Sequence, residues 1–270
     1  MKIRDISLKL FQTDLFNASY LSKKYHLFDD KVGFEKNRNY AALFSGQGIL
    51  KYLHKYQSLT IIALTLDEYA EFKKSSIPHQ KFKETNTILE FTKDYFTNLT
   101  GKTNKPIRSI VNKFSKRLSV RMQTNLNSDT DFYEFIKTWG ILRKERHHML
   151  CTGYDKNFFE KYLRQNSDNL FGFYFYHKGS LIGFSIIEHV SDNLFNLLFR
   201  KSNTEFNGLT QYIDYCSFKS IAEKFNSDII VNMGSDMGDK YLLFNKTHSF
   251  NVETLEIITY KIRIKNEDKK

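Results

Sequence analysis

The sequence predicts an α/β (α+β) protein in which a mixed sheet is flanked by helices. The prediction rests mainly on residues 170–236, which read as three strands, one helix and a fourth strand. Turns at 177–180 and 191–193 separate the three strands, with Gly179 free to take positive φ. The helix starts after Asn207-Gly208 and leads into the β-branched run DIIVN. A meander of hairpins that continues through a helix into another strand is one crossover unit on a mixed sheet.

Length and composition allow one large domain or two small ones. The chain has 270 residues, of which 16% are aromatic, so a packed core is available. No stretch reaches about 20 uninterrupted apolar residues, and the charged N-terminus has no apolar signal segment. The two cysteines, Cys151 and Cys216, form no disulfide framework, and no Cys/His spacing is typical of zinc. We therefore expect a cytoplasmic protein with no transmembrane segment and no metal site.

The formal net charge is +11, from 41 Lys+Arg and 30 Asp+Glu. This excess favours an anionic partner such as RNA, CoA or an acidic lipid surface. The alternative is that a lysine-rich composition reflects an AT-rich genome. The distribution of the charge along the chain therefore has to decide between the two interpretations.

The first 100 residues contain fewer clear signals. Gly46-Gln47-Gly48 precedes a short helical pattern, and a turn before a helix is favoured there over a phosphate loop. The charged stretch 71–84 is predicted to be an exposed loop. The other expected elements are strands at 3–10, 59–66 and 87–91 and a helix at 14–24.

A basic helix is predicted at 101–119. Pro106 suits the first turn of a helix, and the apolar residues that follow share one face: Ile107, Ile110, Val111, Phe114 and Leu118. No acidic residue occurs between Asp94 and Asp129, and this stretch carries Lys102, Lys105, Arg108, Lys113, Lys116, Arg117 and Arg121. These cations form either an anion-binding ridge for RNA or an ordinary solvated helix face.

A second series of elements follows this helix. A short strand is expected at 120–123, and a helix capped by Ser128 or Asp129 places Phe132, Phe135, Ile136, Trp139 and Leu142 inward. Asp155 caps another helix, and the unit at 170–236 comes next. A short helix at 238–245, a strand at 252–264 and a frayed tail at 265–270 complete the chain.

The order of elements from 120 to 264 resembles the GNAT acyltransferase fold. Three local segments are similar to the phosphatidylglycerol lysyltransferase C-terminal domain: 92–114, 197–213 and Asn232-Met233-Gly234-Ser235. Lys246 and Phe250 resemble a late Lys/Phe element of that family. Fem-type aminoacyl-tRNA-dependent transferases are similar in having two such lobes in tandem. The resemblance implies a degraded first lobe at 1–100, a basic connecting helix at 101–119 and a GNAT-like C-terminal lobe at 120–264.

One departure from the acyl-CoA-dependent members concerns the turn before the central helix. Their Gln/Arg-x-x-Gly-x-Gly/Ala turn cradles a pyrophosphate with backbone N–H groups. Here the turn reads Glu205-Phe206-Asn207-Gly208-Leu209-Thr210, so a carboxylate stands at the basic or amide position. We therefore expect weak or absent acetyl-CoA binding and no tightly bound cofactor. The co-substrate is either aminoacyl-tRNA, which is preferred, or acyl-CoA.

Acyl transfer requires a deprotonated acceptor, a stabilised oxyanion and a donor held in line. The catalytic candidates are Tyr212, Asp214, Asp236 and Lys246, of which Lys246 is implied by the resemblance alone. The substrate-binding candidates are Arg200, Asn207, Gly208, Gln211 and Ser235. Four of them have a plainer alternative: Tyr212 as core, Arg200 in a surface ion pair, Asp214 on the helix dipole and Asp236 in a turn.

The predicted function is therefore transfer of an aminoacyl group from aminoacyl-tRNA to an amine or hydroxyl acceptor. The acceptor classes are a lipid headgroup, a peptide and a small molecule, and the first implies peripheral contact with a membrane. Two alternatives stay open: an acyl-CoA-dependent N-acetyltransferase, and a non-catalytic RNA-binding or adaptor protein that keeps the fold.

Overall fold

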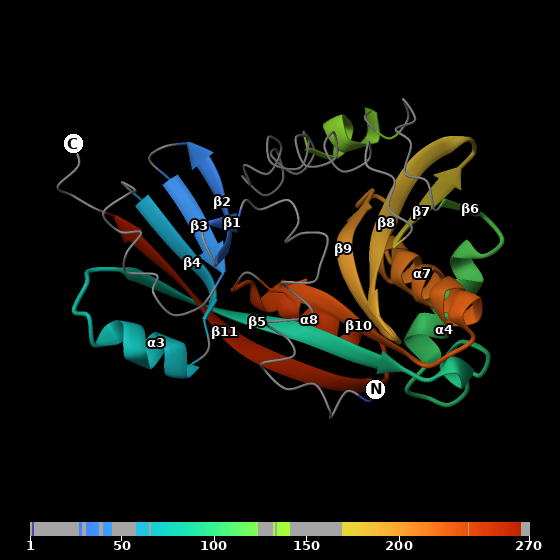
Figure 1. The fold of residues 1–270 in the computed structure, drawn as a ribbon. Coiled ribbons are helices and arrows are strands. Elements are labelled where there is room, and N and C mark those ends of the chain that lie inside the picture. Colours follow the sequence, from blue (N-terminus) through green and yellow to red (C-terminus); the bar gives the residue numbers. More distant parts are fainter. Residues whose placement is uncertain are drawn as a thin grey trace. The chain divides into compact units, whose positions relative to one another are not determined.

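The computed structural model describes residues 2, 27–28, 31–37, 40–44, 58–64, 66–123, 132, 134–140, 169–236 and 238–265. The chain divides into two compact units. Unit 1 comprises Met1–Glu90, Ile230–His248 and Val252–Lys270, and unit 2 comprises Phe91–Ile229 and Ser249–Asn251. Both units combine strands with helices, which confirms the predicted α/β class (Figure 1). No helix in the described part of the chain is long and apolar enough to cross a bilayer.

The two units do not coincide with the boundaries expected at 100 and 120. Strand β10 (Ile229–Ser235), helix α8 (Lys240–His248) and strand β11 (Glu253–Lys265) belong to unit 1 except for Ile229, whereas 170–228 belong to unit 2. The reason lies in β11, which pairs antiparallel with strands β4 and β5 of the first 91 residues. The assignment of lobes at 1–100 and 120–264, with a connecting helix at 101–119, stays a prediction.

Unit 1 contains strands in the order β1-β2-β3-β4-β11-β5-β10. Most described pairs are antiparallel, but β3 and β4 run parallel, so the sheet is mixed as predicted. The remaining bounds are β1 (Leu27–Phe28), β2 (Lys31–Asn37), β3 (Tyr40–Phe44), β4 (Ser58–Leu64) and β5 (Gln80–Phe91).

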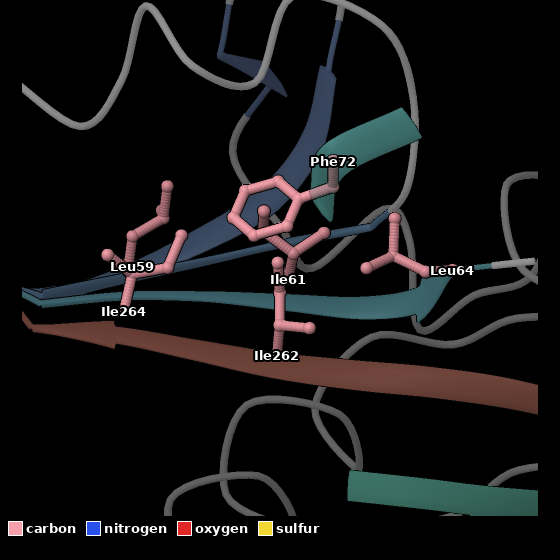
Figure 2. Close-up of a cluster of buried hydrophobic side chains, with 6 residues drawn as sticks. All are labelled: Leu59, Ile61, Leu64, Phe72, Ile262 and Ile264. Atoms are coloured by element: carbon pink, nitrogen blue, oxygen red, sulfur yellow. The ribbon is translucent and has the colours of Figure 1, made fainter. Parts of the chain in front are cut away.

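One core of unit 1 lies between the sheet and helix α3 (Leu66–Lys73) (Figure 2). Phe72 of α3 packs on apolar side chains of β4 and β11, namely Leu59, Ile61, Leu64, Ile262 and Ile264. The exposed loop predicted at 71–84 was wrong, because α3 ends and β5 begins within it. Phe72 is the one buried residue of α3. A single buried apolar residue gives too weak a periodic pattern to predict a helix, and the helix was missed for this reason. The predicted strands at 59–66 and 87–91 correspond to β4 and to the second half of β5.

Unit 2 contains an antiparallel meander in the order β9-β8-β7-β6. The strands are β6 (Ser119–Gln123), β7 (Leu170–His177), β8 (Ser180–Ser191) and β9 (Leu194–Ser202). The predicted turns are confirmed, with positive φ at Lys178 (51°), Gly179 (82°) and Asp192 (41°).

Helices cover both faces of this meander (Figure 1). Helix α7 (Leu209–Phe225) packs on one face, where the rings of Phe175 and Tyr212 lie 6.0 Å apart. Residues 134–140 are helical and lie on the other face, where Phe132 approaches Phe184 to 4.8 Å. The sheet of unit 2 is therefore buried on both sides, which explains its continuous aromatic runs.

Helix α4 (Lys105–Phe114) confirms the predicted basic helix, with Pro106 in its first turn. Phe114 packs on Tyr212 of α7 with ring centroids 5.3 Å apart. Leu118 lies beyond the helix, which ends before Ser115. Several predicted features lie outside the described residues: the strand at 3–10, the helix at 14–24, Gly46-Gln47-Gly48, the caps Ser128, Asp129 and Asp155, and Leu142. Of the tail predicted at 265–270, Lys265 ends β11 and the rest lies outside the described residues.

Candidate functional site

A row of polar side chains joins α7 to the sheet of unit 2. Residues 210, 214 and 217 of α7 follow the helical spacing that places them on one face. Each meets a polar side chain of β8 or β9, in the pairs Ser202–Thr210 (2.7 Å between hydroxyl oxygens), Arg200–Asp214 and Ser185–Ser217 (2.6 Å). We call these six residues the α7 seam.

Arg200 and Asp214 form a buried ion pair at the centre of the α7 seam. The guanidinium Nη1 donates to the carboxylate Oδ2, and the side chains are only 14% and 1% exposed. An ion pair was one of the two interpretations of Arg200, but its position is interior rather than on the surface. A carboxylate that is held by a guanidinium and shielded from solvent is poorly placed to take a proton from an acceptor.

Tyr212 lies in the aromatic core between α7, α4 and the sheet. Its side chain is 4% exposed and packs on Phe114 and Phe175. Burial raises the pKa of Tyr212 above its ordinary value, with a further contribution from the Cys216 thiol. Burial likewise raises the pKa of Cys216 to about 11, so this thiol is protonated at neutral pH. The structure therefore places Tyr212 in the core, with the half-buried Cys216 beside it.

The start of α7 is closed by α4. Gly208 has φ 89° and forms the N-terminal boundary of α7, and a Cβ placed on it would lie 3.2 Å from Cγ1 of Ile110. Lys113 Nζ donates to the Asn207 carbonyl at 2.9 Å. Glu205 is exposed, and its backbone N–H donates to Asn203 Oδ1 at 2.9 Å. The turn expected to hold a pyrophosphate thus carries a carboxylate and is covered by an isoleucine.

Lys246 closes the end of β10 in unit 1. Its side chain is buried, and Nζ donates to the carbonyl oxygens of Met233 (2.6 Å), Gly234 (3.0 Å) and Ser235 (2.8 Å). Gly234 has φ 73°, which lets the strand end curl so that successive carbonyls converge. With three carbonyls accepting its three N–H groups, this ammonium has no lone pair for proton abstraction.

Asp236 stabilises the turn that follows β10. Its Oδ1 accepts from the backbone N–H of Thr85 (2.8 Å) and of Gly238 (3.0 Å). Ser235 Oγ donates to Glu84 Oε2 at 2.9 Å, and Lys261 Nζ lies 3.6 Å from Glu84 Oε1. These contacts agree with the turn-stabilising alternative for Asp236.

The predicted site residues form two groups. In unit 2, Arg200, Asn207, Gly208, Gln211, Tyr212 and Asp214 surround the first two turns of α7; in unit 1, Ser235, Asp236 and Lys246 surround the end of β10. Sequence reasoning missed the other members of the α7 seam, although polar residues at 210, 214 and 217 in a mostly buried helix were a usable signal. Glu84 gave no signal because its segment was assigned to a loop. Within the described ranges, no group of three or more His, Cys, Asp or Glu side chains is arranged to hold a metal ion.

Two of the predicted RNA-binding residues bind backbone carbonyls, Arg108 and Lys113. The Arg108 guanidinium donates to the carbonyl oxygens of Leu99 and Gly101, and Lys113 contacts Asn207. Arg108 therefore holds the loop that precedes α4, and Lys113 contacts the loop that precedes α7. Lys113 is itself exposed, and the other exposed members are Lys102, Lys105, Lys116, Arg117 and Arg121.

Comparisons with known proteins show similarity in fold. No family model matches the sequence, and no curated protein matches it significantly. A conserved protein of unknown function from Bacteroides thetaiotaomicron aligns with a TM-score of 0.61 at 16% identity, covering 97% of this chain and 98% of that one. L-PGS from Bacillus licheniformis aligns with a TM-score of 0.51 at 13% identity, covering 88% and 81%. FemX aligns with a TM-score of 0.51 at 11% identity, covering 90% and 87%.

These neighbours, with a tandem GNAT protein at a comparable level of similarity, confirm a GNAT-like fold. Identities of 11–16% support the fold and leave the reaction to be argued from the residues.

Proposed function

We propose that this chain is a GNAT-superfamily acyltransferase that moves an aminoacyl group from aminoacyl-tRNA to an amine or hydroxyl acceptor. The fold supports the superfamily, since L-PGS and FemX share it over more than four-fifths of their length. The exposed cations of α4 and β6 support a polyanionic donor, because no acidic residue occurs between Asp94 and Asp129 to neutralise them.

The observation that carries the choice of donor is the covered start of α7. A helix N-terminus binds pyrophosphate when its backbone N–H groups are open and no negative charge is nearby. Here Ile110 lies over Gly208, the Lys113 ammonium is directed to the Asn207 carbonyl, and Glu205 adds a carboxylate. These contacts disfavour acyl-CoA and leave aminoacyl-tRNA as the preferred donor.

The proposed reaction requires little chemical activation by the protein. An aminoacyl ester is already activated, so binding the donor and acceptor in line supplies a large part of the rate. The half-buried Gln211 in the first turn of α7 and the fixed Arg200–Asp214 pair beneath it are candidates for orienting the ester.

The test is a transfer assay with the full chain. The protein is incubated with aminoacyl-tRNA labelled on the amino acid and with phospholipid vesicles, a peptide or a small amine. We expect label to move to one acceptor class faster than spontaneous hydrolysis of the ester. Calorimetry with acetyl-CoA is expected to show no binding, and a low-micromolar dissociation constant would transfer the proposal to acyl-CoA.

A second candidate is a non-catalytic RNA-binding protein that keeps the fold. It is favoured by the finding that all four predicted catalytic side chains, Tyr212, Asp214, Asp236 and Lys246, are buried. This candidate predicts tRNA binding without transfer to any acceptor. Transfer above the hydrolysis background would exclude it.

A further inference from the structure

Four segments of unit 2 converge at one end of the β6–β7 ladder. Ser119, which follows the end of α4, pairs with Tyr176 near the end of β7. The ring of His177 lies 5.3 Å from that of Phe206, in the loop before α7. The Lys113–Asn207 contact joins the last turn of α4 to the same loop. The end of α4, the start of β6, the end of β7 and the start of α7 are therefore neighbours.

This region combines cations with an aromatic ring. Four cationic side chains are exposed and one aromatic side chain is half-buried, and together we call them the hairpin patch: Lys116, Arg117, Arg121, Lys178 and Tyr176. Phe206 is not part of the patch, because it packs on His177, whose side chain points to the opposite face of β7 from that of Tyr176. The Arg121 guanidinium carbon lies 5.4 Å from the centre of the Tyr176 ring. A cation against a ring face leaves both groups able to contact a planar anionic ligand.

The charge of the hairpin patch is almost wholly positive. No acidic residue occurs between Asp94 and Asp129, and none occurs between Asp168 and Glu188. Glu205, beside Phe206, is exposed and accepts from Asn203 Nδ2 at 3.3 Å. One carboxylate at the border against four exposed cations favours an anionic partner.

The Tyr176 ring narrows the class of anion. Phosphates along a duplex need only cations, whereas an unpaired strand also offers base faces that stack on aromatic side chains. The cations at the other end of α4, Lys102 and Lys105, make no cation–π contact among the described residues, in contrast to Arg121. The hairpin patch has both features that single-stranded binding requires.

We propose that the hairpin patch binds single-stranded RNA, and that it receives the unpaired 3′ end to which the aminoacyl group is esterified. The second half of this statement rests on the proposed function. The Lys113–Asn207 contact places the patch beside the start of α7, where the substrate-binding candidates Gly208 and Gln211 lie. RNA binding thus belongs to one end of α4 rather than to the whole helix.

The first experiment measures binding of a labelled single-stranded RNA of about six nucleotides by fluorescence anisotropy. Lys116→Glu/Arg117→Glu is compared with Lys102→Glu/Lys105→Glu, which makes the same charge change on exposed residues at the two ends of one helix. We expect about tenfold weaker binding for the first pair and less than about twofold for the second. Thermal melting should be unchanged in both, because all four side chains are exposed.

The second experiment separates stacking from charge. Tyr176→Leu keeps an apolar side chain but removes the ring, and we expect about fivefold weaker binding of the single strand with the same slope in log salt. Lys116→Glu/Arg117→Glu should instead reduce that slope by about 0.7 for each lost phosphate contact. A duplex of the same length should be insensitive to Tyr176→Leu.

Three results would overturn the inference: equal weakening by the two charge-reversed pairs, a duplex that binds as well as the single strand, or patch variants that bind like the parent. The transfer assay separates this inference from the proposed function. Patch-dependent RNA binding by a chain that transfers nothing keeps the inference and rejects the transferase. Transfer that the patch variants leave unchanged supports the transferase and rejects the inference.

Discussion

The α7 seam and the end of β10 both contain a buried charge, and they stabilise it in different ways. In the seam, the Asp214 carboxylate is held by another side chain, the guanidinium of Arg200. At the end of β10, the Lys246 ammonium is held by three backbone carbonyls. The first arrangement depends on two residues that substitution can change together. The second depends on one residue and on the path of the backbone.

This difference bears on function as well as stability. A side-chain pair on a helix and a strand fixes how the two elements lie against each other, so Arg200–Asp214 positions the start of α7. A lysine that binds consecutive carbonyls shapes a single strand end, and Gly234 with φ 73° is part of that shape. Both were catalytic or binding candidates, and both have architectural roles that account for their residue types.

The largest expected effect comes from breaking the α7 seam on one side. Arg200→Met removes the guanidinium that faces the 1%-exposed Asp214 carboxylate, and we expect a loss of about 3–5 kcal/mol in the free energy of unfolding. The double variant Arg200→Met/Asp214→Leu should recover most of this loss, because neither charge then remains. Urea denaturation measures both, and a double variant as unstable as the single one would contradict a simple ion pair.

A somewhat smaller loss is expected at the end of β10. Lys246→Met keeps the apolar stem but leaves the carbonyls of 233–235 without the ammonium, at a cost of about 2–4 kcal/mol. Lys240→Met is the matched control, since Lys240 is exposed at the start of the same helix and should change stability by less than about 0.5 kcal/mol. No second side-chain substitution should recover the stability lost in Lys246→Met, because the groups left without a partner are backbone carbonyls. In the seam, by contrast, Asp214→Leu is expected to recover the stability lost in Arg200→Met. Equal stability of the two lysine variants would contradict the role of the carbonyls.

The smallest expected effect tests the covered start of α7. Gly208→Ala and Gly179→Ala both place a Cβ on a residue with φ above 80°, so both are expected to lose about 1–2 kcal/mol. Only Gly208 has a neighbour in the way, since its Cβ would meet Ile110 at 3.2 Å whereas nothing lies within 4 Å at Gly179. The excess loss at Gly208, about 1 kcal/mol, should disappear in an Ile110→Ala background. If both alanine variants melt alike in the parent background, α4 does not cover the turn.

The sequence predicted unit 2 more fully than unit 1. The runs at 170–176 and 181–190 are bounded by turns with strong local signals, and α7 starts at a glycine, so local chemistry was sufficient to place β7, β8, β9 and α7. Helix α3 and the first half of β5 were missed, because their charged surfaces dominate the pattern and only Phe72 reaches a core. The membership of β11 in unit 1 depends on pairing with strands about 170 residues away, which no local window contains.

The sequence by itself determined which residues form the meander and α7, and where the uninterrupted positive charge lies. Only the tertiary structure decided what each charged or polar side chain does there. It assigned Arg108 and Lys113 to loop carbonyls, Arg200 to Asp214 and Lys246 to the strand end, and it left Lys116, Arg117 and Arg121 exposed. The physical reason is that secondary structure follows from neighbours in the chain, whereas the partner of a buried charge comes from whichever segment packs against it.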